Sequence, residues 1–234
     1  MEGSHRGTII RSYQTDSPVG TEFLRLFHGL VRGTDPKEPK TYLITSATVG
    51  EGKSTAASFL SITTASLKKK TLLVDADLRR PAIHRFFDLS LEDGVTDVSD
   101  GAIPLAKAYK ETELPHLSVL TAGRLARDPR IYFEDGHLQR LLIEFRARFD
   151  FVVIDCAPVM PVMDTLLLAP IVTGVLLVVK AGATHRELVK EASESLKKAK
   201  APLSGMVLND VKEVLPYHYG HRYAYQYYTP IERG

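Results

Sequence analysis

The sequence predicts an α/β domain built on a doubly wound, mostly parallel β-sheet. Short apolar runs alternate with helical patterns, and the runs are almost continuously apolar, as strands buried on both faces must be. The length of 234 residues suits one large domain. Apolar residues make up 44% of the chain and charged residues 25%, which is ordinary for a globular protein. We therefore expect one sheet with helices packed on both faces.

Six strands are expected, each a short and nearly continuous apolar run. In chain order they cover residues 41–46, 71–77, 117–123, 151–158, 174–182 and 204–210. Helical spacing of apolar residues occupies intervals between them, most clearly at 54–67, 135–148 and 184–199. This alternation is typical of parallel strands joined by crossover helices.

An amphipathic helix is expected ahead of the first strand, over residues 18–32. Its apolar positions share one face, whereas Glu22, Arg25 and His28 recur every third residue along another. The segment 35–39, DPKEP, then reads as a linker into the sheet.

The chain is expected to divide into three segments. Residues 1–16 form an N-terminal tail, part of which is consistent with an expression-vector remnant, and residues 17–212 form the folded domain. Residues 213–234 form a flexible C-terminal tail, because regular patterning is lost beyond Asn209. Six of the ten tyrosines of the chain lie in this tail, between positions 217 and 228.

Composition argues against several classes of protein. The net charge is only +2 and the basic clusters are short and scattered, so nucleic acid is not an expected partner. The single cysteine, Cys156, cannot form an internal disulfide, which indicates a reducing compartment, and we expect it to be a small buried side chain. No apolar run approaches the roughly 20 residues that cross a bilayer. The first ten residues lack the basic and apolar regions of a signal peptide.

A phosphate-binding loop is predicted between the first strand and the first core helix, in ATVGEGKST (47–55). Backbone N–H groups and the amino end of the helix would face a polyphosphate, and Lys53 would reach its outer oxygens. Ser54 would offer its hydroxyl to Mg²⁺, and Ala47 stands where the strict pattern has glycine. The residues expected to contact nucleotide in this loop are Thr48, Val49, Gly50, Glu51, Gly52, Lys53, Ser54 and Thr55.

Three carboxylates are expected to converge on this loop. Asp75 and Asp77 are two residues apart at the end of a predicted strand, so both side chains point the same way. Asp155 ends another apolar strand, at the carboxyl edge where open α/β sheets bind ligands. Any one of them alone could be a turn former. Together beside a glycine-rich loop they predict an ATP site.

Phosphoryl transfer requires positioning and charge neutralisation from a protein. Lys53 and Mg²⁺ would offset the charge on the outer phosphates, and Ser54, Asp77 and Asp155 would hold the metal. Asp75 is the favoured base, although the choice between Asp75 and Asp77 stays open. A water acceptor would make the protein an ATPase. A phenol, with a pKa of about 10, would make it a tyrosine kinase and would need the base more.

Three motifs together resemble those of the bacterial protein-tyrosine kinases (BY-kinases) of capsule and exopolysaccharide loci. SATVGEGKST resembles their Walker A motif, LLVDADLRRPAIH their Walker A′ motif, and FVVIDCAPV followed by Asp164 their Walker B motif. The tyrosine-rich tail completes the set in the order of the family, and the resemblance runs from about Ser17 to Tyr228.

This resemblance implies a P-loop NTPase fold of the deviant Walker A type, related to MinD and ParA. It also implies ATP-dependent autophosphorylation of the tail, largely between subunits of a ring-shaped homo-oligomer, which regulates polysaccharide polymerisation and export. The implied acceptors are Tyr217, Tyr219, Tyr223, Tyr225, Tyr227 and Tyr228.

Partners and location are likewise implied by the family. The activator would be the cytoplasmic end of a transmembrane polysaccharide co-polymerase, fused or separate, and a cognate tyrosine phosphatase would reverse the modification. The chain would be cytoplasmic, at the inner face of the bacterial plasma membrane through a partner or a fused segment.

Two positions depart from the family pattern. The oligomerisation motif of the family is Glu, two residues, Arg, two residues, Arg, and here it reads Glu22, Arg25, His28. Because an imidazole is often uncharged near neutral pH, ring formation is expected to be weaker or pH-sensitive, unless Arg32 substitutes. Ile131 stands where relatives commonly place an acid, so no site is expected there.

Two other functions are consistent with the same site. A MinD, ParA or iron-protein-like ATPase would use the tail for docking, but those relatives carry a signature lysine where this chain has Thr48. A non-enzymatic module would hold nucleotide as a structural ligand, which the Walker A′ acids argue against. The resemblance to either family implies that Asn209 would contact adenine. The alternative is that Asn209 is an ordinary turn-forming residue.

Overall fold

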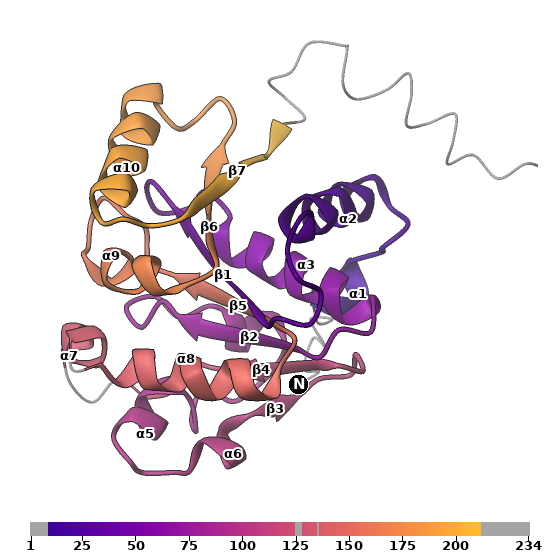
Figure 1. The fold of residues 1–234 in the computed structure, drawn as a ribbon, viewed down its shortest axis with the longest axis vertical. Coiled ribbons are helices and arrows are strands. Elements are labelled where there is room, and N and C mark those ends of the chain that lie inside the picture. The colour runs from indigo at the N-terminus through magenta and orange to yellow at the C-terminus, as the bar shows by residue number, and fades with distance from the viewer. Residues whose placement is uncertain (1–8, 125–127, 135, 212–234) are drawn as a thin grey trace, which may run out of the picture.

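The computed structural model describes residues 9–124, 128–134 and 136–211, which form one sheet between two layers of helices (Figure 1). Within these residues the sheet has seven strands in the order β3-β4-β2-β5-β1-β6-β7. All neighbouring strands are parallel except β3, which is antiparallel to β4 at one edge. The strands are β1 Lys40–Ser46, β2 Thr71–Ala76, β3 Lys110–Glu111, β4 Leu117–Leu120, β5 Phe151–Cys156, β6 Gly174–Lys180 and β7 Leu203–Asn209.

The prediction of a doubly wound, mostly parallel α/β sheet is confirmed. Each expected strand is present, and β1, β2 and β5 are buried along their whole length, as their continuous apolar runs require. The two-residue strand β3 was not expected. The helical layers lie on opposite faces of the sheet (Figure 1).

One layer contains the first four helices: α1 Ile9–Ser12, α2 Pro18–Val31, α3 Lys53–Ser66 and α4 Ile83–Phe86. The other layer contains the rest: α5 Val95–Ser99, α6 Leu105–Ala108, α7 Pro129–Glu134, α8 His137–Arg148, α9 Asp164–Leu168, the 3-10 turn η1 Ala169–Ile171, and α10 Arg186–Lys198. Because β1, β2 and β5 are parallel, their carboxyl ends lie at the same edge of the sheet.

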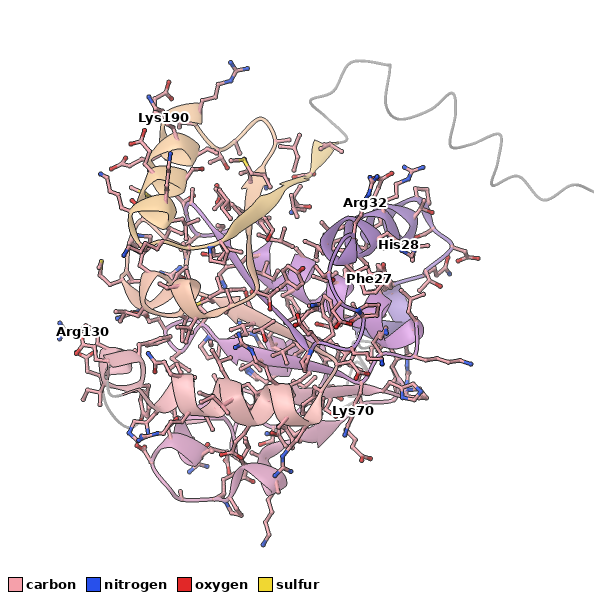
Figure 2. All side chains as sticks on the ribbon, in the orientation of Figure 1. Phe27, His28, Arg32, Lys70, Arg130 and Lys190 are labelled. Carbon is pink, nitrogen blue, oxygen red and sulfur yellow. The ribbon has the colours of Figure 1, made fainter. Side chains whose placement is uncertain are left out.

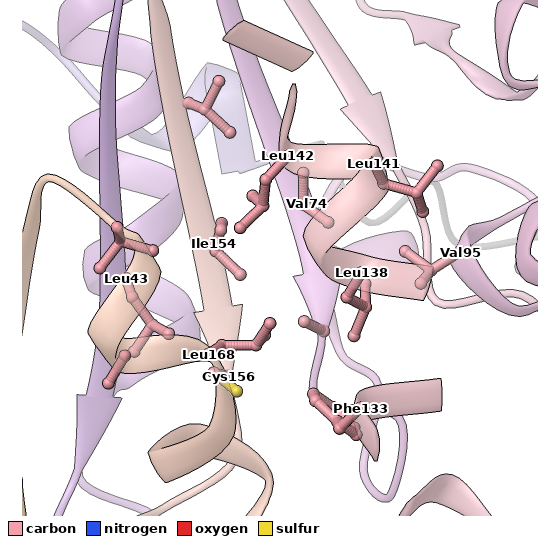
Figure 3. Close-up of a cluster of buried hydrophobic side chains, with 14 of the residues drawn as sticks. Leu43, Val74, Val95, Phe133, Leu138, Leu141, Leu142, Ile154, Cys156 and Leu168 are labelled. Carbon is pink, nitrogen blue, oxygen red and sulfur yellow. The ribbon is translucent and has the colours of Figure 1, made fainter. Parts of the chain in front are cut away.

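Helix α8 shows how the second layer packs. Its leucines at 138, 141 and 142 recur at helical spacing, and all are buried. Figure 3 shows Leu142 facing Val74 of β2 and Ile154 of β5, whereas Leu141 extends toward Val95 of α5. Burying a leucine side chain stabilises a fold by roughly 1.5–3 kcal/mol. This cluster therefore holds the two acid-bearing strands in place. Cys156 lies in the same core, as a small buried side chain.

The expected amphipathic helix is α2, which packs on the opposite layer. Ser17 caps it by accepting a 3.0 Å hydrogen bond from the backbone N–H of Gly20. The Phe27 ring lies 5.8 Å from the ring of Phe151 at the start of β5. The Tyr42 hydroxyl donates to the carbonyl of Leu30 at 2.7 Å. These contacts fix α2 against β1 and β5.

Residues ahead of position 17 also pack on the domain. The Tyr13 side chain is buried, its hydroxyl is hydrogen-bonded to that of Thr63, and its ring lies 4.6 Å from that of Phe59. Packing on α3 therefore begins before residue 17, where the folded domain was expected to start. The tail at 213–234 lies outside the described residues.

No helix in the described ranges combines the length and the apolar character that a membrane crossing needs.

Candidate active site

The predicted phosphate loop joins β1 to α3. β1 ends at Ser46 and α3 begins at Lys53. Gly50 and Gly52 have φ angles of 80° and 92°, a left-handed conformation that side-chain-bearing residues rarely adopt. A Cβ atom at Gly52 would lie 2.1 Å from Nδ2 of Asn209, so only glycine fits beside that amide.

Lys53 lies at the centre of the cluster. Its Nζ is 2.7 Å from Oδ2 of Asp77, 3.3 Å from Oδ1 of Asp155 and 3.2 Å from Oγ of Ser54. The lysine side chain is only 11% exposed and the two carboxylates less still. Burial opposes its charge, but the carboxylates of Asp155 and Asp77 raise the pKa of Lys53 overall. The structure therefore brings the predicted lysine, serine and acids together.

Asp75 and Asp155 occupy aligned positions on β2 and β5 and are both fully buried. Oδ2 of Asp75 accepts hydrogen bonds from the backbone N–H groups of Ala82 and Ile83, each at 3.0 Å, and so caps α4. Burial, and then the charge of Asp155, raise the pKa of Asp75, while the N–H of Ile83 opposes the rise. Oδ1 of Asp75 has no hydrogen-bond partner among the described residues.

The donor set fits a magnesium ion. Oδ2 of Asp155 is buried without a hydrogen-bond partner among the described residues, and the Ser54 hydroxyl and the Asp77 carboxylate lie around the same ammonium. Oxygen donors of this kind suit Mg²⁺, which usually takes its remaining ligands from phosphate and water. The described residues hold no group of three or more His, Cys, Asp or Glu side chains placed to bind a metal ion.

Glu51 of the phosphate loop is hydrogen-bonded to residues at or just after the ends of β6 and β7. Nδ2 of Asn209 donates to the carbonyl of Glu51 at 3.0 Å. The Glu51 carboxylate accepts from the backbone N–H of Thr48 at 3.0 Å and from the hydroxyl of Thr184. The structure thus places Asn209 against the phosphate loop, and its expected contact with adenine stays a prediction. It also adds Thr184, which no sequence pattern indicated.

A second ion pair missed by sequence reasoning borders the site. Arg79 binds Asp164 with two parallel bonds, Nε to Oδ2 at 2.8 Å and NH2 to Oδ1 at 3.1 Å. Asp164 is almost fully buried, and Arg79 follows Asp77 in the Walker A′ segment. The bridge therefore ties the loop after β2 to the segment after β5. The two residues could have been noticed in the sequence, because Arg79 lies within the Walker A′ segment and Asp164 follows the Walker B segment.

The residues expected at an oligomer interface lie on one outward surface of α2. Glu22 and Arg25 form an exposed ion pair, and His28 is exposed one turn further on. Figure 2 shows His28 and Arg32 on the outer part of this helix, whereas Phe27 lies toward the sheet. The tyrosine cluster at 217–228 falls outside the described residues.

Comparisons with known proteins agree with this geometry. The ParA family model, described as NUBPL iron-transfer P-loop NTPase, matches residues 38–226. The tyrosine-protein kinase YwqD of Bacillus subtilis is 35% identical over 79% of this chain and 78% of its own length. The putative tyrosine-protein kinase CapB of Staphylococcus aureus is 31% identical over 92% of this chain and 97% of its own. The crystal structure of the chimerical protein CapA2B2 superposes with a TM-score of 0.80 and 29% identity, over 86% of this chain and 88% of that one.

The matched region includes the phosphate loop, both acid-bearing strands and Asn209, so the likeness extends through the whole site. The chain therefore belongs to the bacterial protein-tyrosine kinases (BY-kinases) of capsule and exopolysaccharide systems, and it is a tyrosine-protein kinase with the P-loop NTPase fold of ParA.

Proposed function

We propose that this kinase transfers the γ-phosphate of ATP to tyrosines in its own C-terminal tail, within an oligomer and from one subunit to another. The observation that carries the proposal is the Lys53 ammonium, which lies within 3.3 Å of two carboxylates, that of Asp77 directly after β2 and that of Asp155 on β5. A site of that kind positions phosphate and a metal rather than forming a covalent intermediate. The acceptors would be Tyr217, Tyr219, Tyr223, Tyr225, Tyr227 and Tyr228.

Each residue has a distinct role in this proposal. Lys53 would bind the outer phosphate oxygens, with the N–H groups of the loop around them. Ser54, Asp77 and Asp155 would hold Mg²⁺, which when bound offsets the negative charge of the phosphates. Oδ1 of Asp75 has no hydrogen-bond partner in the part of the chain that the structure describes, which supports this residue as the base that accepts the phenol proton.

Asp75 has two tasks in this arrangement. One oxygen caps α4 and the other is free of hydrogen bonds from the described residues. To act as this base, Asp75 must first release the proton that its raised pKa favours, and the resulting carboxylate is then a stronger acceptor of the phenol proton than an ordinary one. Because Asp75 is fully buried, the acceptor hydroxyl would reach it only if the segment after β2 moves.

The family relationship supports the partners and the biological setting. CapB of Staphylococcus aureus is similar to most of this chain, and the chimerical protein CapA2B2 shares its fold. We propose that the cytoplasmic end of a membrane-bound polysaccharide co-polymerase activates the kinase at the inner face of the plasma membrane. A tyrosine phosphatase would reset the tail, and the cycle would control capsule or exopolysaccharide polymerisation.

Modification of the tail would itself change the assembly. Each phosphate adds about −1.5 to −2 charge at neutral pH. A tail with several phosphates would be repelled by the acidic surroundings of Asp75, Asp77 and Asp155. Subunits would therefore separate as phosphorylation proceeds.

Purified protein incubated with Mg·ATP and the activator fragment tests the proposal, with phosphate mapped by mass spectrometry. Phosphotyrosine should accumulate within 217–228 in the parent chain and be absent in Lys53→Met. Lys190→Met is the matched control, because Lys190 lies exposed on α10, where Figure 2 labels it, and pairs with Glu194 rather than with a residue of the site. A map without phosphotyrosine in this segment would sink the proposal. Phosphate release that survives replacement of all six tail tyrosines by phenylalanine, without tyrosine labelling, would indicate an assembly ATPase instead.

A further inference from the structure

The phosphate loop contains a buried negative charge that the proposed chemistry does not use. Glu51 is only 3% exposed, although its neighbours Gly50 and Gly52 form the turn that would surround phosphate. A carboxylate on the phosphate side of such a loop would repel the ligand. Its side chain must therefore be held in a fixed direction.

Two contacts hold that side chain. One oxygen accepts the backbone N–H of Thr48 at 3.0 Å, and the other accepts the hydroxyl of Thr184. Both carboxylate oxygens are thus engaged, one by the loop itself and one by the turn between β6 and α10.

Thr184 donates in its bond to Glu51, because a carboxylate oxygen is an acceptor. The same hydroxyl oxygen accepts the backbone N–H of Lys180 at 3.1 Å, which holds the hydroxyl in place. The backbone N–H of Thr184 also donates to the carbonyl of Lys180 at 3.0 Å, which closes the turn. The hydroxyl of Thr184 is therefore held as a hydrogen-bond donor in the turn after β6.

A parallel connection reaches the same loop residue from β7. The side-chain amide of Asn209 donates to the backbone carbonyl of Glu51, and the backbone carbonyl of Asn209 accepts the N–H of Ala181 at 2.8 Å. The segment after β6 is thus hydrogen-bonded to the end of β7, and both contact Glu51. Thr184, after β6, contacts the Glu51 side chain, and Asn209 of β7 contacts its main chain.

We propose that Glu51 and Thr184 are positioning residues for the nucleotide. Their bridge directs the Glu51 charge away from the phosphates and holds the N–H groups of the loop ready to bind them. The identity of the ligand rests on the proposed function, but the bridge itself does not depend on phosphorylation. Lost pre-organisation would raise the nucleotide dissociation constant without changing the groups that touch the reacting phosphate.

Thr184→Val and Thr184→Ser form the decisive pair of variants. Valine keeps the shape but removes the donor, and serine keeps the hydroxyl. We expect valine to raise the dissociation constant of Mg·ADP about tenfold, the effect of losing one hydrogen bond to a charged group. Serine should stay within about twofold of the parent chain. Isothermal titration calorimetry measures both, on variants whose melting temperatures are recorded in parallel.

A double-mutant cycle shows whether Thr184 acts through Glu51. In a Glu51→Ala background, Thr184→Val should have no further effect on Mg·ADP affinity, because the bond is already lost. Hydrogen exchange without nucleotide gives a second readout, and amides of 47–55 should exchange faster in Thr184→Val than in Thr184→Ser. If Glu51→Ala does not fold, the valine and serine pair and its exchange rates decide alone.

The proposal is overturned if folded Thr184→Val binds Mg·ADP within about twofold of the parent chain, or if its effect is equally large without Glu51. It is also overturned if serine weakens binding as much as valine. These outcomes are separate from a failure of the proposed function, because nucleotide affinity and hydrogen exchange are measured without any phosphotyrosine.

Discussion

Asp75 and Asp155 lie side by side, at aligned positions on the neighbouring parallel strands β2 and β5, and neither is exposed to solvent. Two carboxylates so placed cannot both ionise at low cost. Burial raises the pKa of Asp155 as well, while the charge of Lys53 lowers it. One of the two carboxyl groups is therefore favoured to keep its proton, and Lys53 balances the negative charge of the other.

Asp75→Asn is expected to stabilise the fold while abolishing tyrosine labelling. The folded-state pKa of Asp75 is raised, so between the unfolded and folded pKa values the folded protein keeps a proton that the unfolded chain releases, and stability falls as pH rises. Asparagine removes this penalty and keeps an oxygen for the N–H groups of Ala82 and Ile83. Urea unfolding should show a gain on the order of 1 kcal/mol at pH 8 and less at pH 5.

Asp88→Asn is the control for that variant, because Asp88 is exposed and asparagine tolerates its positive φ of 53°. Its stability should change by less than about 0.5 kcal/mol at either pH. A loss of stability in Asp75→Asn at pH 8 would contradict the argument.

Lys53→Met is expected to destabilise the fold in addition to ending phosphoryl transfer. Removing one member of a buried ion pair leaves charge without compensation, which costs about 3 kcal/mol. Without Lys53, the pKa of Asp155 should rise further, so the loss of stability should be greater at pH 8 than at pH 5. Thermal unfolding at the two pH values measures this. An equal loss at both would show that packing of the lysine stem, rather than its charge, is responsible.

The convergence of Lys53, Asp75, Asp77 and Asp155 was predictable because parallel strands place their carboxyl ends at one edge of a sheet. Strand runs such as β5 were equally clear, since burial on both faces leaves a continuous apolar signal. Strand β3 left no such signal, because it consists of one lysine and one glutamate. Helices of four or five residues, such as α4 and α9, are too short to show a helical period.

The partners of Glu51 and Arg79 could not be predicted, because they depend on tertiary approach. Thr184 is 133 residues from Glu51, and Asp164 is 85 residues from Arg79. No local pattern marks a threonine as the donor to a distant carboxylate. Only the turn between β6 and α10, once folded, brings it to the phosphate loop.

Arg79→Ala should destabilise the protein by about 2–3 kcal/mol, because it leaves the buried Asp164 carboxylate without its two hydrogen bonds. Arg79→Lys keeps the charge but loses the paired geometry, so about half of that loss is expected. The control is Arg130→Ala, which removes the exposed pair with Asp128 and should cost less than about 1 kcal/mol. Equal losses for the two alanine variants in urea unfolding would refute the distinction.

His28→Arg should strengthen self-association through the outward surface of α2. The arginine would complete the charge pattern begun by Glu22 and Arg25. Sedimentation velocity should show more oligomer for this variant than for the parent chain at pH 8. Ile143→Arg, which adds the same charge at an exposed position of α8, should leave the distribution unchanged. Equal oligomer fractions for the parent chain and His28→Arg at pH 8 would mean that residue 28 takes no part in the interface.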